Sequence, residues 1–242
     1  PALELVIRDA DGNVIRRVDA PAEKGFHRVA WDLRHPFYGS VETPPNWQGL
    51  PPAGFMVRPG AYSAELVLMK DGESRRLAEP VSFDVERLYE KTALEGASME
   101  AVDAFWKDYS TLSAQVSAAQ YALEDAVEDV QTLQTMLAST ARAPGELDAR
   151  LHALRQELYE LDESLTGHKS RDEIGSYDVH RVTDWMSHAY NGVDNSSYGP
   201  TTAHRQSLGY AREVFAPIRE RLNAIIESDI PALRDALRKA GA

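Results

Sequence analysis

The stretch VDAFWKDYSTLSAQVSAAQYALEDAVEDVQTLQTML, residues 102–137, decides the fold. Its apolar side chains recur at gaps that alternate between three and four residues, a period typical of a long helix burying a coiled-coil seam. The pattern predicts a helix over residues 98–142, roughly 65 Å long, capped by Ser98 and ended by Pro144. The predicted seam consists of Val102, Phe105, Tyr109, Leu112, Val116, Ala119, Leu123, Ala126, Val130, Leu133 and Leu137.

Two more seams of the same period follow. A predicted helix over residues 144–166, which Gly167 ends, carries Leu147, Leu151, Leu154, Leu158, Leu161 and Leu165. A predicted helix over 202–240 carries Leu208, Ala211, Phe215, Ile218, Leu222, Ile225 or Ile226, Leu233 and Leu237. We expect Thr201 or Thr202 to cap this helix and bends near Pro217 and Pro231.

With a shorter helix over 177–190, these segments predict an antiparallel bundle of three or four helices over residues 98–242. A polar connector, residues 89–97, leads into it.

Residues 1–88 have the pattern of short strands. Apolar alternation, with the hairpin dipeptides Asp11-Gly12 and Asp71-Gly72, predicts an immunoglobulin-like or fibronectin-like β-sandwich. A predicted strand over residues 26–33 contains Trp31, which we interpret as a core anchor, the alternative being a ligand-stacking residue. The fold class is therefore α+β and multidomain.

A long loop rich in proline and glycine, residues 35–59, interrupts the strand pattern. It contains the large apolar residues Phe37, Tyr38, Trp47, Phe55 and Met56. Such a loop either covers a neighbouring surface, of the helical domain or of a longer precursor, or forms a binding site. We favour the first interpretation.

The formal net charge of −12 is unevenly distributed, with 24 acidic and 15 basic residues from residue 91 onward. This balance argues against nucleic acid as a partner. No apolar run approaches the roughly 20 residues of a membrane helix. The chain has no cysteine, which is compatible with an oxidising compartment. It begins at Pro1 in a strand pattern, so we interpret it as part of a longer precursor.

Four of the seven histidines, His168, His180, His188 and His204, lie between the predicted long helices or near their ends. His180, Asp184 and His188 are spaced four apart and share one helical face, which makes them a weak metal candidate. The favoured interpretation is solvated or hydrogen-bonded histidines. We therefore expect no metal and no cofactor.

Residues 191–200 are dense in Gly, Asn, Asp and Ser and predict a turn between two antiparallel helices. A ligand or partner site is the alternative, with the candidate residues Asn191, Asp194, Asn195, Tyr198, His204 and Arg205. Asn195 also begins a tripeptide that fits the N-glycosylation pattern. Carboxylate pairs such as Glu124 and Asp125 are interpreted as solvated surface, and no catalytic motif predicts an enzyme.

Several segments resemble one protein family. They are DADGNVIRR (9–17), GFHRVAWDLR (25–34), RPGAY (58–62), LEGAS (94–98), APGEL (143–147) and SYGPT (197–201) followed by His204 and Arg205. They resemble the C-terminal region of bacterial BNR-repeat, sortilin-like β-propeller proteins, which are often labelled glycosyl hydrolases. The strand-rich part is also similar to the immunoglobulin-like domain of flagellar hook-capping proteins. The resemblance implies a secreted, periplasmic or cell-surface parent with propellers upstream of residue 1.

We therefore expect a non-catalytic accessory region that acts as a spacer or protein-docking module. Its partner would be the upstream propellers of its own chain or another protein. The alternative is a glycan- or peptide-binding module that uses the aromatic loop 37–56 or the loop 191–205. A hydrolase, metal-assisted through His180, Asp184 and His188, is the third hypothesis.

Overall fold

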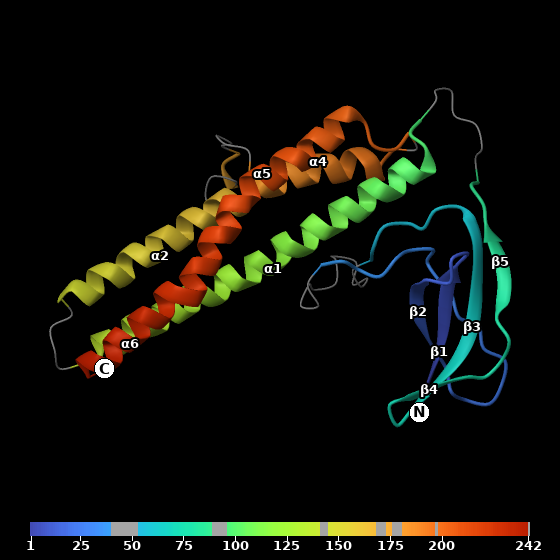
Figure 1. Ribbon diagram of the computed structural model, residues 1–242, viewed down its shortest axis with the longest axis horizontal. Helices are drawn as coiled ribbons and strands as arrows, with labels where there is room; N and C mark the ends of the chain where they lie inside the picture. The colour runs from blue at the N-terminus through green and yellow to red at the C-terminus, as the bar shows by residue number, and fades with distance from the viewer. Residues whose placement is uncertain are drawn as a thin grey trace. The chain divides into compact units, whose positions relative to one another are not determined.

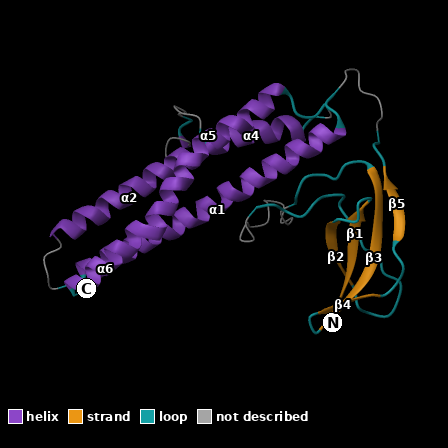
Figure 2. Ribbon diagram, in the orientation of Figure 1, coloured by secondary structure: helices purple, strands orange, loops and turns teal. Residues whose placement is uncertain are grey.

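The computed structural model describes residues 1–39, 53–88, 96–140, 145–167, 173–175, 181–196 and 198–241. The chain has an α+β fold, in which a five-stranded antiparallel sheet at the N-terminus is followed by helices (Figure 2). It divides into two compact units, Pro1–Trp106 and Lys107–Ala242. The prediction of an α+β chain with strands first and helices second is confirmed.

The sheet has the strand order β2-β1-β3-β4, and β5 pairs with the same edge of β3 as β4 does. The central pair, β1 and β3, is antiparallel throughout. Both predicted hairpin dipeptides form turns, and Gly72 has a positive φ of 82° that favours glycine. The strands are β1 Ala2–Asp9, β2 Val14–Ala20, β3 Gly60–Lys70, β4 Glu73–Arg76 and β5 Val81–Val85.

One face of the sheet carries the apolar cluster of the first unit, formed by Ile7, Val57 and Tyr62 with partly buried neighbours. Coil segments cover this cluster. The backbone N–H of Val57 donates to Leu33 at 2.8 Å, and an isolated bridge joins Arg34 to Met56. The layer over this face is therefore made of coil in the described residues.

The predicted strand over residues 26–33 is wrong, because this segment is coil. Asp32 accepts the backbone N–H of Arg34 at 3.1 Å, and Leu33 has a positive φ of 58°. This local side-chain hydrogen bond competes with strand pairing. Trp31 nevertheless contacts the core, with its ring 5.7 Å from Tyr62 and 6.2 Å from Phe83.

The opposite face of the sheet carries ion pairs. The carboxylate of Glu65, which is only 5% exposed, lies between Arg8 at 2.9 Å and Arg76 at 3.0 Å. Arg17 and Glu4 form a further pair at 2.9 Å. The hydrogen bond from Arg8 lowers the pKa of Glu65 below its ordinary value, and the charges of both arginines outweigh the opposing effect of burial.

Acid should therefore destabilise the first unit through Glu65. A carboxylate whose folded pKa is depressed contributes stability above its unfolded pKa of about 4.3, and this is lost as the pH falls through the folded pKa. Urea unfolding at about pH 7 and pH 3 should show that Glu65→Gln reduces the pH dependence of the unfolding free energy. The exposed Glu23→Gln is the control, and an equal pH dependence in both variants would contradict the assignment.

The helices are α1 Met99–Ala138, α2 Gly145–Leu165, α4 Val182–Asp194, α5 Thr202–Ala224, the π-helix η1 Ile225–Asp229 and α6 Ile230–Ala240. The predicted seam of α1 is buried from Phe105 to Leu137. Ser98 caps α1 as predicted, accepting the N–H of Ala101 at 3.2 Å. Gly167 follows the end of α2 with a positive φ of 97°, also as predicted.

The segment α5–η1–α6 runs parallel to α1 in the helical unit (Figure 1). Three contacts join them: Arg212 to Asp108 at 2.7 Å, Arg219 to Gln115 at 3.4 Å and Arg234 to Asp129 at 3.2 Å. The partners lie 104, 104 and 105 residues apart in sequence. The two segments therefore run in parallel along their shared length, with a register shift of one residue between the second and third contacts.

The π-helix η1 adds one residue to α5–η1–α6, which accounts for the increase from 104 to 105 residues between bonded partners. The buried positions of α5 recur at three and four residues up to Ile225, but the next buried position is Ile230. A π turn holds one more residue than an α turn, so the seam returns to the same side after η1. Helix η1 also directly precedes α6, in which Pro231 occupies the first turn, where a missing backbone N–H is tolerated. The helix over 202–240 was predicted with bends near Pro217 and Pro231; in the structure Pro217 lies inside α5, and the π turn interrupts the helix directly before Pro231.

Helix α2 runs antiparallel to α1 and α5 (Figure 1), and an ion pair joins it to α5. Arg221 donates to Glu157 with two nitrogens and contacts Asp229 of η1 at 2.8 Å. The hydrogen bond with Glu157 raises the pKa of Arg221, and it lowers the pKa of the Glu157 carboxylate. This bidentate geometry favours the charged state of both groups. Among the described residues, none of the helices is long and apolar enough to cross a membrane.

Candidate functional site

The junction of α4 and α5 brings together several polar side chains from both helices. The two helices pack closely through small residues, with Ala189 and Ala211 fully buried and Ser207 4% exposed. Thr201 and His204 lie where α5 begins, and His188 faces them from α4. This junction is the candidate site that we consider in most detail.

His204 caps the helix of which it is part. Its Nδ1 accepts the backbone N–H of Thr201 at 3.3 Å, while the Thr201 hydroxyl accepts the N–H of His204 at 3.4 Å. This is a capping box in which histidine takes the place usually held by Glu or Gln. Because Nδ1 acts as an acceptor, the ring is neutral, with its proton on Nε2.

The His204 ring packs against α4. A Cβ added to Gly192 would overlap the ring, so glycine at this position makes room for it. The rings of His188 and His204 lie 5.6 Å apart with edge-to-face geometry. Burial lowers the pKa of His204, and the charge of His188 lowers it further.

His188 also contacts the buried Ser207, with 2.8 Å between Nδ1 and the hydroxyl oxygen. A Ser–His pair at this distance is the geometry of an activated nucleophile. Because Ser207 is only 4% exposed, a substrate carbonyl cannot reach its hydroxyl in this conformation. The pair therefore satisfies a buried polar group and joins α4 to α5.

The metal candidate is only partly described. Asp184 accepts the N–H of Arg181 at 3.1 Å and lies 3.7 Å from its guanidinium, so this carboxylate completes the capping box of α4. His188 contacts Ser207 and His204, while His168 and His180 lie outside the described residues. Over the described ranges, no group of three His, Asp, Glu or Cys side chains is close enough to hold a metal ion.

The predicted loop 191–200 begins later than expected. Helix α4 was predicted to end at residue 190 but continues to Asp194, so Asn191 and Asp194 are helical. The carbonyl of Asn191 accepts the backbone N–H of Asn195 at 3.2 Å, which extends the helix by a turn. Asn195 is its C-cap.

The other candidates of this region are spread over the turn and α5. Tyr198 is 38% exposed, and its backbone N–H donates to the hydroxyl of Ser196 at 3.1 Å. Arg205 is exposed on α5, one residue after His204. Of the predicted ligand set, the structure thus brings Asn191 and Asn195 together, and it places His204 against Gly192.

The aromatic loop is divided between described and undescribed residues. Trp47 lies outside the described residues. Phe37 and Tyr38 are half-buried and stack on each other, with ring centroids 5.4 Å apart. Phe55 is buried and stacks on Trp106 within the first unit, with centroids 6.1 Å apart and planes inclined by 7°. Phe55 therefore has a packing role.

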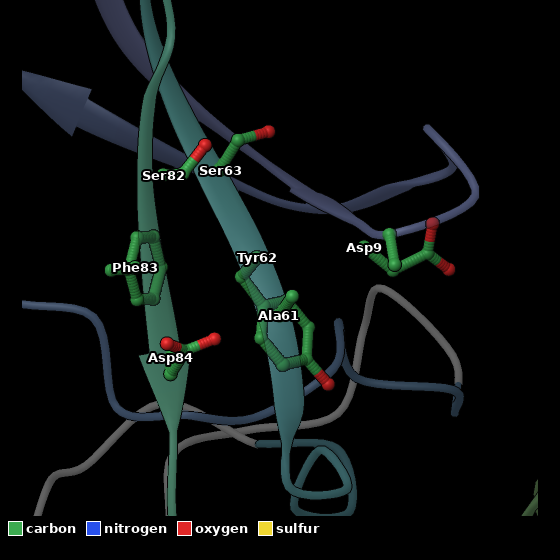
Figure 3. A pocket seen from close by; sticks show the side chains of 8 residues that line it. Asp9, Ala61, Tyr62, Ser63, Ser82, Phe83 and Asp84 are labelled. Carbon is green, nitrogen blue, oxygen red and sulfur yellow. The ribbon is translucent and has the colours of Figure 1, made fainter.

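A hollow of about 390 Å³ lies on the charged face of the sheet (Figure 3). Its floor is formed by the small residues Ala61 and Ser63 of β3 and Ser82 of β5, with Asp9 on one side and Asp84 on the other. An adjoining hollow of about 310 Å³ shares Asp9 and Ala61 with it.

Two polar groups that line this hollow, Asp9 and Tyr62, have local partners. Burial raises the pKa of Asp9, but hydrogen bonds from Asn13 and Asp11 outweigh this effect and lower it. The hydroxyl of Tyr62 donates to the carbonyl of Arg58 at 2.7 Å. Both groups are thus held in structural hydrogen bonds, and the hollow was not predicted from the sequence.

Sequence reasoning missed Gly192 and Ser207 as members of the helical junction. Gly192 was interpreted as a loop glycine, because residues 191–200 are dense in Gly, Asn, Asp and Ser. Ser207 precedes the seam residue Leu208, and its position next to that stripe could have indicated burial. Comparison with protein-family models, curated proteins and solved structures gave no significant match.

Gly192→Ala should destabilise the helical unit by roughly 1 kcal/mol, because the new methyl displaces the His204 ring and breaks the cap of α5. The matched control is Gly209→Ala in α5, where an added Cβ meets nothing within 4 Å. That change should stabilise the unit by about 0.5–1 kcal/mol through helix propensity. Denaturant unfolding measures both, and stabilisation by both variants would contradict the described contact.

Proposed function

We propose that this chain is a non-catalytic accessory region of a larger secreted propeller protein, in which the helices act as a spacer or protein-docking module. The observation that carries this proposal is the register between α1 and α5–η1–α6. A 40-residue helix is bonded at three levels to a parallel neighbour. A helix braced in this way resists bending more than a single helix would.

The architecture that we propose for this role is an up-down-up helical bundle joined to an immunoglobulin-like module. Support for the bundle comes from the buried seams of α1, α2 and α5 and from the Arg221–Glu157 pair. Support for a two-layer module comes from the coil over the Ile7 and Tyr62 face. In this proposal, that coil takes the place of a second sheet.

The alternative is a glycan- or peptide-binding module in the first unit. It is favoured by the stacked pair Phe37 and Tyr38, whose rings are half-buried. A further large aromatic residue, Trp47, follows them in the sequence. Stacked aromatic rings offer a flat surface to a sugar or to a proline-rich peptide. Tyr38→Ala would remove half of this surface.

A binding experiment separates the two proposals. The chain is titrated with separately produced propeller domains of its parent protein, and thermal shifts are measured with a panel of saccharides and peptides. The spacer and docking proposal predicts binding to the propellers that survives Tyr38→Ala. A saccharide-induced shift that Tyr38→Ala abolishes, without propeller binding, would favour the alternative. A zinc-induced shift lost in His188→Ala would instead support the metal-assisted hypothesis.

A further inference from the structure

The capping box at the start of α5 depends on the protonation state of one side chain. His204 accepts the N–H of Thr201 through Nδ1 at 3.3 Å, and it can do so only while Nδ1 carries no proton. Glu and Gln, the usual residues at this position, remain acceptors over the whole range from pH 5 to 8. Histidine is the residue whose charge changes in that range.

Protonation of His204 would oppose three features of its surroundings. The cap would be lost, because two N–H groups would then face each other at Thr201. The new positive charge would lie in the first turn of α5, where the helix dipole is also positive. It would further lie beside the His188 ring, whose centroid is 5.6 Å away.

The packing of the ring leaves it little freedom to relieve these conflicts. It lies against Gly192, where even one added carbon would overlap it. Two charged residues lie near this point of the chain, Asp194 at the end of α4 and Arg205 directly after His204 in α5. Both are exposed to solvent. Burial and the charge of His188 lower the pKa of His204, so the neutral ring is the one suited to this fold.

We propose that His204 is an acid-sensitive latch that closes the turn between α4 and α5 at neutral pH and releases it as the pH falls. This conformational device goes beyond the spacer role and does not depend on it. Because the folded pKa lies below the unfolded one of about 6.5, the latch stabilises the turn above that pH. The stabilisation decreases as the pH falls toward the folded pKa. The stability that carboxylates such as Glu65 contribute is lost only at lower pH, below about 4.3.

Hydrogen–deuterium exchange of the whole chain tests the latch. Protection of the first-turn amides of α5, corrected for the intrinsic pH dependence of exchange, is compared at about pH 7.5 and pH 5.5. We expect an approximately fivefold loss of protection in the wild type, the size typical of losing one N-cap. His204→Gln keeps an acceptor in the capping box and cannot titrate, so its protection should be unchanged.

A second variant keeps the test decisive if His204→Gln does not fold. His188→Gln removes the neighbouring charge while keeping a hydrogen-bonding group for Ser207, and it should move the midpoint of the protection loss to higher pH. The proposal is overturned if the wild type keeps its protection at pH 5.5. It is equally overturned if His204→Gln loses protection as the wild type does, or if His188→Gln leaves the midpoint where it was.

Discussion

Leu123→Asp is expected to unfold the helical unit. Leu123 is 3% exposed in the middle of the α1 seam, which is buried on both sides of it at Ala119 and Ala126. The change removes a buried leucine, typically a loss of about 2–5 kcal/mol, and places an unpaired carboxylate in an apolar environment. The sum is comparable to the whole stability of an ordinary domain, about 5–15 kcal/mol. Circular dichroism at 222 nm and the Tm measure the loss.

The matched control introduces the same carboxylate on the exposed side of α1. Gln131→Asp changes an exposed residue two turns further along the helix and should cost only a few tenths of a kcal/mol. Equal helicity and equal Tm in Leu123→Asp and Gln131→Asp would show that the seam has been assigned to the wrong face.

Trp31→Ala is expected to have the largest effect on the first unit. The indole contacts Tyr62 and Phe83 in the apolar cluster, and its N–H donates to the carbonyl of Arg34 at 3.1 Å. Truncation of a core tryptophan typically costs about 3–5 kcal/mol. A unit this small has a limited core, so we expect loss of its cooperative unfolding transition.

Two variants identify the cause of that loss. Trp31→Phe keeps an aromatic ring against Tyr62 and loses mainly the hydrogen bond to Arg34, so its cost should be smaller, about 1–2 kcal/mol. Phe26→Ala removes a side chain that is 93% exposed and should be nearly neutral. If Trp31→Ala were as mild as Phe26→Ala, Trp31 would not anchor the core.

The long helices could be predicted because their signal is repeated many times. Each seam residue of α1 supports the same period, and no single position decides the assignment. The caps at Ser98 and Thr201 were also predictable, because the hydroxyl at each helix start bonds an N–H within the first turn. Trp31 packs against the core cluster, as the core-anchor interpretation expected, although its own segment is coil rather than strand.

Features that depend on one local contact could not be predicted in the same way. The strand over 26–33 failed because Asp32 bonds the backbone of Arg34, and an alternating pattern does not show this competition. The π-helix adds one residue to the seam between Ile225 and Ile230, which the sequence left as a choice between Ile225 and Ile226. The spacing between bonded residues of the two helices grows from 104 to 105 residues across it.

The candidate site was only partly predictable. Histidines were expected to gather near the ends of the helices, and His188 and His204 do meet. The contact requires Gly192 to be helical, whereas its sequence context favoured a turn. The hydroxyl of Ser207 reaches His188 only because two helices distant in sequence pack closely. Tertiary contacts of this kind leave no periodic signal.

One distance in the helical unit tests the central claim, a long α1 braced in parallel by α5–η1–α6. Because the chain has no cysteine, spin labels can be attached to new cysteines at the exposed positions Thr111 of α1 and Lys239 of α6. With partners 105 residues apart, Lys239 lies level with residue 134, about 35 Å along the axis from Thr111. Pulsed electron paramagnetic resonance should give one narrow distribution near 35–40 Å. A distribution centred below about 20 Å, or a broad one, would contradict the parallel, braced arrangement.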